Sequence, residues 1–183
     1  MSNTVKEKKE GNWLLKIFIV TFILSIFFNY LTSEIVDNLN MYISIVILVI
    51  VIFIGIISDL IATAVTAADE VPFHAKAADK KKGAKESVKL IKNAAKVSNV
   101  CGDVIGDICG VLSGATSALI AVNISSSIGQ KDVTLVTMLM TAIVTSLTVL
   151  GKGLGKHIGI SKANKIVDTL GIVINFLKIN TKK

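Results

Sequence analysis

Four apolar stretches of membrane-spanning length constrain this chain more than any other feature. They cover residues 13–31, 41–67, 100–124 and 133–150, and a helix needs about 20 apolar residues to cross a hydrocarbon core of ~30 Å. The chain has 52% apolar residues, a mean hydropathy of +0.69 and one proline in 183 residues, unlike a soluble domain. We therefore expect an all-α integral membrane protein with four transmembrane helices.

The lysines predict the orientation of the chain, which has no arginine. Segments 1–16, 68–99 and 151–183 carry four, eight and seven lysines, whereas 32–40 carries none and 125–132 carries one. Because lysines concentrate on the cytoplasmic side, both termini and the 68–99 segment are expected in the cytoplasm, next to a multi-pass inner or plasma membrane. This spread of a net charge of +7 favours contact with membrane lipid and argues against nucleic-acid binding.

Two segments outside the predicted spans have helical patterns. Residues 69–99 offer two short helical stretches divided at Gly83, which predict a cytoplasmic juxtamembrane helical hairpin. In the tail, Ser161 can cap a helix whose apolar stripe contains Ile166, Leu170, Val173 and Leu177. We expect this C-terminal helix to be amphipathic and to lie on the membrane surface, or else to dock a partner.

Three aspartates fall within the predicted spans. A carboxylate at membrane depth costs at least ~2.5 kcal/mol, so chains rarely keep one without a use for it. At 1.5 Å rise per residue, Asp59 and Asp107 lie at matching depth, each roughly 7 Å to the cytoplasmic side of the midplane, and Asp103 lies one turn further. With Ser58 beside them, these oxygen donors fit a hard divalent cation such as Mg²⁺.

Other polar and small residues in the spans have simpler interpretations. Glycines at 102, 106, 110 and 114 predict close helix packing, and a stripe of threonines at 134, 137, 141, 145 and 148 predicts hydroxyls that satisfy backbone carbonyls or face neighbouring helices. The aspartates could also be structural, with Asp103 paired to Lys96. The sequence contains no nucleophile set, zinc-spaced cysteines or phosphate-binding loop, so we do not expect an enzyme.

The order of these motifs resembles the transmembrane domain of the cyclin M and CorB/CorC magnesium transporters. Ser58-Asp59 before LIATAVTAA is similar to the Ser-Glu motif of the first core helix in that family. The sequences at 83–93 (GAKESVKLIKN) and 102–108 (GDVIGDI) resemble the family's GA-[RK] turn and its GNNLVNI helix. GKGLGK at 151–156 stands where the family has GE-x-x-PK.

This resemblance implies a transporter-like domain at 41–160, with its cytoplasmic hairpin at 69–99. The domain follows an N-terminal tail, extra helix and external loop at 1–40, and precedes an amphipathic tail at 161–183. By position, the resemblance implies that Ser58, Asp103 and Asp107 hold a dehydrated Mg²⁺, with Asp59 as a supporting carboxylate. The chain departs from the family at Lys152, where the motif has glutamate, and at Gly155, where it has proline; no paired CBS domains are present in these residues. Lys152 could pair with an aspartate and silence the site.

The leading hypothesis is a dimeric protein of the inner membrane that transports or binds a divalent cation. The alternative is a non-transporting scaffold or regulatory protein derived from the transporter fold, acting through the basic hairpin and the tail. A third hypothesis is a small membrane-permeabilising protein of the holin type, because glycine ladders promote oligomers. Four spans with a patterned hairpin make that third hypothesis less economical.

Overall fold

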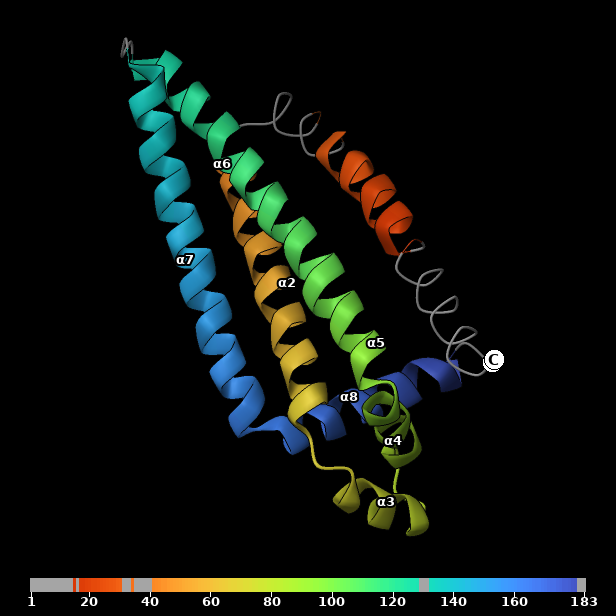
Figure 1. Ribbon diagram of the computed structural model, residues 1–183. Helices are drawn as coiled ribbons and strands as arrows, with labels where there is room; N and C mark the ends of the chain where they lie inside the picture. The colour runs from red at the N-terminus through yellow and green to blue at the C-terminus, as the bar shows by residue number, and fades with distance from the viewer. Residues whose placement is uncertain (1–14, 16, 31–33, 35–40, 129–131, 181–183) are drawn as a thin grey trace, which may run out of the picture. The chain divides into compact units, whose positions relative to one another are not determined.

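The computed structural model describes residues 15, 17–30, 34, 41–128 and 132–180, and over these residues it contains helices and no strands (Figure 1). The long helices are α2 (Met41–Ala67), α6 (Asp107–Ile128) and α7 (Val133–Ser161). The shorter ones are α3 (Val71–Ala78), α4 (Ala84–Lys92), α5 (Ala94–Ser98), the π-helical segment η1 (Asn99–Gly106) and α8 (Ala163–Asn180). The all-helical prediction is confirmed for the described residues.

Three helical stretches are long and apolar enough to cross a membrane. They are Met41–Ala67, Ala94–Ser126 and Val133–Ser161, the second of which joins α5, η1 and most of α6. Of the first predicted span, the described part includes a shorter apolar helix, Ile17–Tyr30, while residues 13, 14, 16 and 31 lie outside the described residues. Three of the four predicted spans therefore have the required length and composition.

The chain divides into two compact units. The first comprises the described residues of Met1–Val51 and Ile108–Thr145. Its α6 buries small hydroxyl residues, and the hydroxyls of Ser113 and Ser117 donate to carbonyls one turn earlier at 2.9 and 2.8 Å. Thr137 and Thr141 do the same on α7, where each hydroxyl donates to a backbone carbonyl at 2.8–3.1 Å. For these two threonines, satisfaction of the backbone is the interpretation that the structure confirms.

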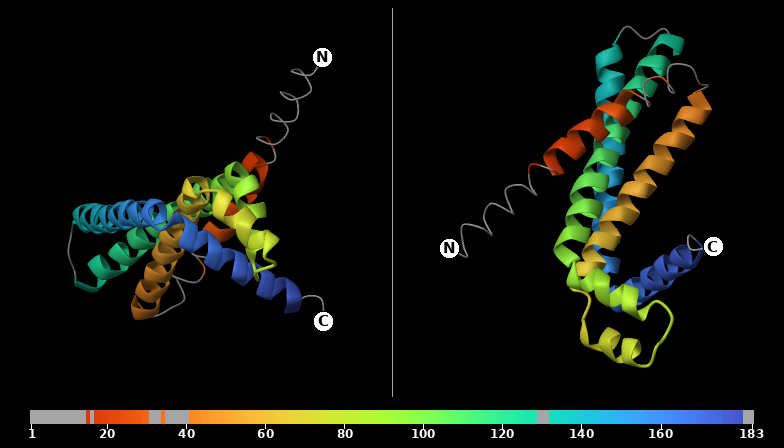
Figure 2. Two further views of the ribbon diagram at one scale, coloured as in Figure 1. Left: turned by 90° about the horizontal axis from the view of Figure 1, so that it is seen from below. Right: turned by 90° about the vertical axis from the view of Figure 1, so that its right-hand side faces the viewer.

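The second unit comprises Ile52–Asp107 and Ser146–Lys183. Its apolar core lies where α3, α4 and α8 gather around the end of α2, a group of helices that we call the α3–α4–α8 cluster (Figure 2). Four residues form this core with at most 1% of their surface exposed: Ala64, Val65, Phe73 and Val167. A fully buried Phe is worth roughly 1.5–3 kcal/mol, so this cluster is held mainly by apolar burial.

Two glycines allow α4 and α8 to approach each other at backbone distance. Gly83 has a φ of +81°, and a Cβ placed there would lie 2.6 Å from the backbone nitrogen of Ile172. A Cβ on Gly171 would lie 2.5 Å from the Gly83 carbonyl oxygen and would also collide with the Ser87 hydroxyl. That buried hydroxyl donates to the Val167 carbonyl at 3.1 Å. Close packing and this hydrogen bond fix α8 on α4.

The C-terminal region adds detail to the prediction and corrects it at Ser161. Helix α7 contains the predicted span at 133–150 and continues beyond it to Ser161. The Ser161 hydroxyl does not cap α8, since it donates backwards to the Ile158 carbonyl at 3.3 Å. On α8, Val173 and Leu177 are exposed, whereas Val167, outside the predicted stripe, is fully buried.

Candidate functional site

Glycines at four-residue spacing bring α7 close to the second half of α2. A Cβ on Gly151 would collide with the Ile56 side chain, and one on Gly155 would lie 3.5 Å from the Ile56 carbonyl oxygen. A Cβ on Gly159 would lie 3.0 Å from the Leu60 carbonyl oxygen. Small residues at this spacing are a common device for close helix packing in membranes. The face of α7 that bears these glycines therefore packs directly on α2.

Lys152 follows the first of these glycines and contacts the start of α6. Its ammonium donates to the Gly106 carbonyl at 3.1 Å and lies 3.7 Å from Asp107 Oδ1. The Lys152 side chain is 22% exposed, whereas that of Asp107 is 74% exposed. The predicted pairing of Lys152 with an aspartate is thus confirmed, and a backbone carbonyl is a second ligand of the same ammonium group.

Lys156 lies one turn further along α7 and pairs with Asp59 of α2. Its ammonium is 3.4 Å from Asp59 Oδ2, longer than the 2.7–2.9 Å typical of a charge-assisted hydrogen bond. The Asp59 side chain is only 11% exposed and that of Lys156 is 56% exposed. Oδ2 of Asp59 is buried and accepts no hydrogen bond from the described residues. Burial of a carboxylate oxygen without a hydrogen bond is costly, and the ion pair with Lys156 is the contact that compensates for it among the described residues.

The π-helical segment η1 contacts both α2 and α7 near the two lysine–aspartate pairs. The Ser58 hydroxyl donates to the Cys101 carbonyl at 2.6 Å, and the Lys152 ammonium donates to the Gly106 carbonyl. Side chains from α2 and α7 therefore form hydrogen bonds to backbone oxygens of η1. A Cβ on Gly102 would lie 3.2 Å from the Ala62 Cβ and 3.7 Å from Asp59 Oδ1. π-helical turns are rare and often occur at functional sites. The sequence GDVIGD thus adopts its unusual backbone next to the buried carboxylate.

Only part of the predicted glycine ladder packs closely. A Cβ on Gly106 would lie 3.7 Å from the Lys152 ammonium, and Gly102 contacts α2 as described above. A Cβ on Gly110 or Gly114 would meet no described atom within 4 Å. Close packing is confirmed for Gly102, where the Ala62 Cβ would lie at 3.2 Å, and it stays a prediction for the other three glycines.

Among the described residues, the aspartates predicted to bind a divalent cation form no cluster of three acidic side chains. Asp103 is exposed, and no three His, Cys, Asp or Glu side chains among the described residues lie close enough to hold a metal ion. Mg²⁺ requires about six oxygen ligands, and in this arrangement lysine ammonium groups lie next to Asp59 and Asp107. The site is therefore an array of two carboxylates neutralised by two lysines.

Three features of this site escaped the sequence analysis. These are Lys156, the glycine spacing of 151, 155 and 159, and the π-helical backbone of η1. The first two had a visible signal, because Lys156 stands four residues after Lys152 and the glycines repeat every four residues. The π-helix has no comparable signal in the sequence.

Comparison with known proteins identifies no relative of this chain. No family model, curated protein or solved structure gives a significant match to the chain. The resemblance to the cyclin M and CorB/CorC transporters therefore depends on the motif residues alone.

Proposed function

We propose that this is a multi-pass membrane protein that binds and transports a divalent cation, with Mg²⁺ the best match to its oxygen donors. In this proposal Lys152 and Lys156 neutralise the carboxylates when no ion is bound. The finer topology follows the lysine distribution: four spans, with both termini, the 69–99 hairpin and the C-terminal tail in the cytoplasm. The homodimer remains part of the proposal.

The observation that carries the proposal is the state of Asp59. This carboxylate is buried within a helix that is apolar enough to span a membrane, and one of its oxygens accepts no hydrogen bond from the described residues. A group that only stabilised the fold would be expected to have its hydrogen bonds satisfied. The neighbouring Ser58 hydroxyl donates to Cys101 and keeps its lone pairs, so it can still act as an oxygen ligand.

The charges permit an exchange between lysines and ion. Two aspartates and two lysines sum to zero, and one divalent cation carries the charge of the two ammonium groups that it would displace. Lys156 is more than half exposed and can leave Asp59 without a penalty of burial. Lys152 would give up both the Gly106 carbonyl and Asp107. Each displaced group exposes oxygen atoms of the hard type that Mg²⁺ prefers.

A transport assay with matched charge variants tests this proposal. The full chain is reconstituted in vesicles, and Mg²⁺ uptake is compared between the wild type and the Asp59→Asn/Asp107→Asn variant. The control is Asp79→Asn/Asp132→Asn, which removes two exposed carboxylates outside the charge pairs. We expect uptake by the site variant to fall to that of protein-free vesicles while the control retains it. Equal uptake by wild type and site variant would contradict the proposal.

The non-transporting regulatory protein is kept as a second candidate because of one observation. The Lys152 ammonium contacts both a backbone carbonyl and Asp107. These are the oxygen atoms that a bound cation would need as ligands. If that contact is permanent, the ammonium group takes the place of the cation, and wild type and site variant will both lack Mg²⁺ uptake and Mg²⁺ binding. That pair of results would favour the second candidate over the first.

A further inference from the structure

The second unit contains an apolar groove that two lysines also line. The groove has a volume of about 380 Å³ and lies between the second half of α2 and the first turns of α8. Its aliphatic wall is formed by Ile57 and Ile61 of α2 together with Ile166 and Leu170 of α8. Lys162 and Lys165 line the same groove.

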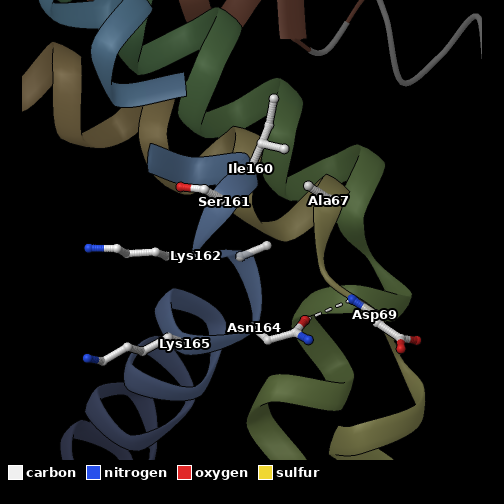
Figure 3. Close-up of a pocket in the computed structure, with 8 residues that line it drawn as sticks. Ala67, Asp69, Ile160, Ser161, Lys162, Asn164 and Lys165 are labelled. Atoms are coloured by element: carbon white, nitrogen blue, oxygen red, sulfur yellow. Dashed lines mark hydrogen bonds between the residues drawn. The ribbon is translucent and has the colours of Figure 1, made fainter. Parts of the chain in front are cut away.

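These two lysines differ from four other lysines of the second unit, which are ion-paired. Lys76, Lys152, Lys156 and Lys178 each lie within 4.0 Å of a carboxylate. Lys162 and Lys165, in contrast, are exposed and form no ion pair with any residue that the structure describes. Figure 3 shows both side chains extending in the same direction, away from the Asp69 carboxylate. Their positive charges are therefore available to an external anion.

A second hollow of about 380 Å³ adjoins these lysines and adds polar groups. It is lined by Ser161, Asn164 and Asp69 as well as by Lys162 and Lys165 (Figure 3). The Asn164 side-chain oxygen accepts the Asp69 backbone N–H at 2.9 Å, which leaves the Asn164 amide nitrogen as a donor. The Asp69 carboxylate would repel an anion, but it lies on the opposite side of Asn164 from the two ammonium groups (Figure 3).

The position of the lysines on α8 gives a further electrostatic reason for an anion. Lys162 directly precedes α8 and Lys165 lies in its first turn, which contains no acidic residue. The N-terminus of a helix carries a partial positive charge, so lysines there are electrostatically unfavourable. A bound anion would relieve this repulsion.

We infer that this groove binds an anionic glycerophospholipid, with its phosphate at Lys162 and Lys165 and an acyl chain along Ile57, Ile61, Ile166 and Leu170. The groove is lined by residues of α2 and of the first turns of α8, and it adjoins the end of α7; α2 and α7 are both long and apolar enough to span a membrane. It therefore offers positive charge for a lipid headgroup and an apolar wall for an acyl chain. This inference does not depend on cation transport.

Native mass spectrometry of the purified full chain with added lipid tests the inference. The probes are phosphatidylglycerol and phosphatidylcholine with identical acyl chains. The test variant is Lys162→Gln/Lys165→Gln, and the matched control is Lys81→Gln/Lys82→Gln, which removes the same charge from the turn before α4. Lys162→Arg/Lys165→Arg keeps the charge at the site.

We expect the wild type, the control and the arginine variant to bind phosphatidylglycerol more tightly than phosphatidylcholine by about thirtyfold, the scale expected for two lysines near anionic lipid. The glutamine variant at 162 and 165 should lose this preference. Substitution of the exposed Ile57 by Ser should weaken binding of both lipids, because both use the apolar wall.

Three results would overturn the inference. The wild type could bind the two lipids equally, or the glutamine variant at 162 and 165 could keep the full preference. Alternatively, inorganic phosphate without lipid could bind as tightly as phosphatidylglycerol with the same dependence on the lysines. That last result would assign the site to a free phosphate.

Discussion

Two lysine–aspartate pairs in the second unit show how the same residue types can have different roles. In the α3–α4–α8 cluster, Lys76 donates a 2.8 Å hydrogen bond to Asp168, and both side chains are about one-third exposed. Between α7 and α2, Lys156 approaches Asp59 to only 3.4 Å, and the carboxylate is buried while the lysine is exposed. The first pair has the geometry of an ordinary surface salt bridge. The second leaves a carboxylate oxygen unsatisfied and its lysine able to leave.

The packing around the two pairs differs in the same way. Phe73 and Val167 form an apolar core beside the first pair, whereas the second pair lies where glycines of α7 contact α2. Apolar burial therefore stabilises the cluster independently of its salt bridges. At the α2–α7 crossing, close backbone contact stabilises the helices.

The largest expected effect on stability is that of Phe73→Ala in the cluster. Removal of a fully buried Phe typically costs 3–5 kcal/mol, through lost burial and the cavity left behind. Hydrogen–deuterium exchange should show faster exchange of backbone amides in α3 and in the part of α8 around Val167. Val71→Ala, at a position that is 73% exposed, is the control and should leave exchange unchanged. If backbone amides in both variants exchange as slowly as in the wild type, Phe73 does not stabilise the cluster.

Gly171→Ala should have the next largest effect, because its methyl group would collide with the backbone and Ser87 of α4. Overpacking typically costs about 1–3 kcal/mol, and α8 should separate from α4. A cysteine pair placed on exposed positions of α4 and α8 for spin labelling would report a longer distance. Gly153→Ala is the matched control, since a Cβ at Gly153 meets nothing within 4 Å. The same distance in Gly171→Ala as in the wild type would be evidence against close packing at this crossing.

Lys76→Gln should have the smallest effect, because a salt bridge whose side chains are about one-third exposed contributes about 0–1 kcal/mol. A double-mutant cycle with Asp168→Asn, read out by thermal unfolding, measures this coupling directly. Mg²⁺ binding should be unaffected in all three variants, because neither residue belongs to the intramembrane pairs. A coupling well above this range, or any loss of Mg²⁺ binding, would remove the contrast between the two pairs.

The sequence predicts the helices and part of the site because apolar length and local spacing are visible in it. The three spanning stretches and the division at Gly83 follow from these signals. The pairing of Lys152 with an aspartate was one of two possibilities raised by the departure at 152 from the family motif. Burial on α8 was predicted less well, because an amphipathic stripe does not show which side another helix covers, and the buried Val167 was missed.

The central claim is that two lysines occupy the carboxylates that a divalent cation would bind. The most direct test is equilibrium Mg²⁺ binding to the full chain, measured by displacement of bound Mn²⁺ in the wild type and in Lys152→Gln/Lys156→Gln. Loss of the competing ammonium groups should tighten Mg²⁺ binding by about fivefold or more, the equivalent of ~1 kcal/mol of lost ion pairing. Lys76→Gln should leave the affinity unchanged. Unchanged or weaker binding after removal of both lysines would contradict the claim.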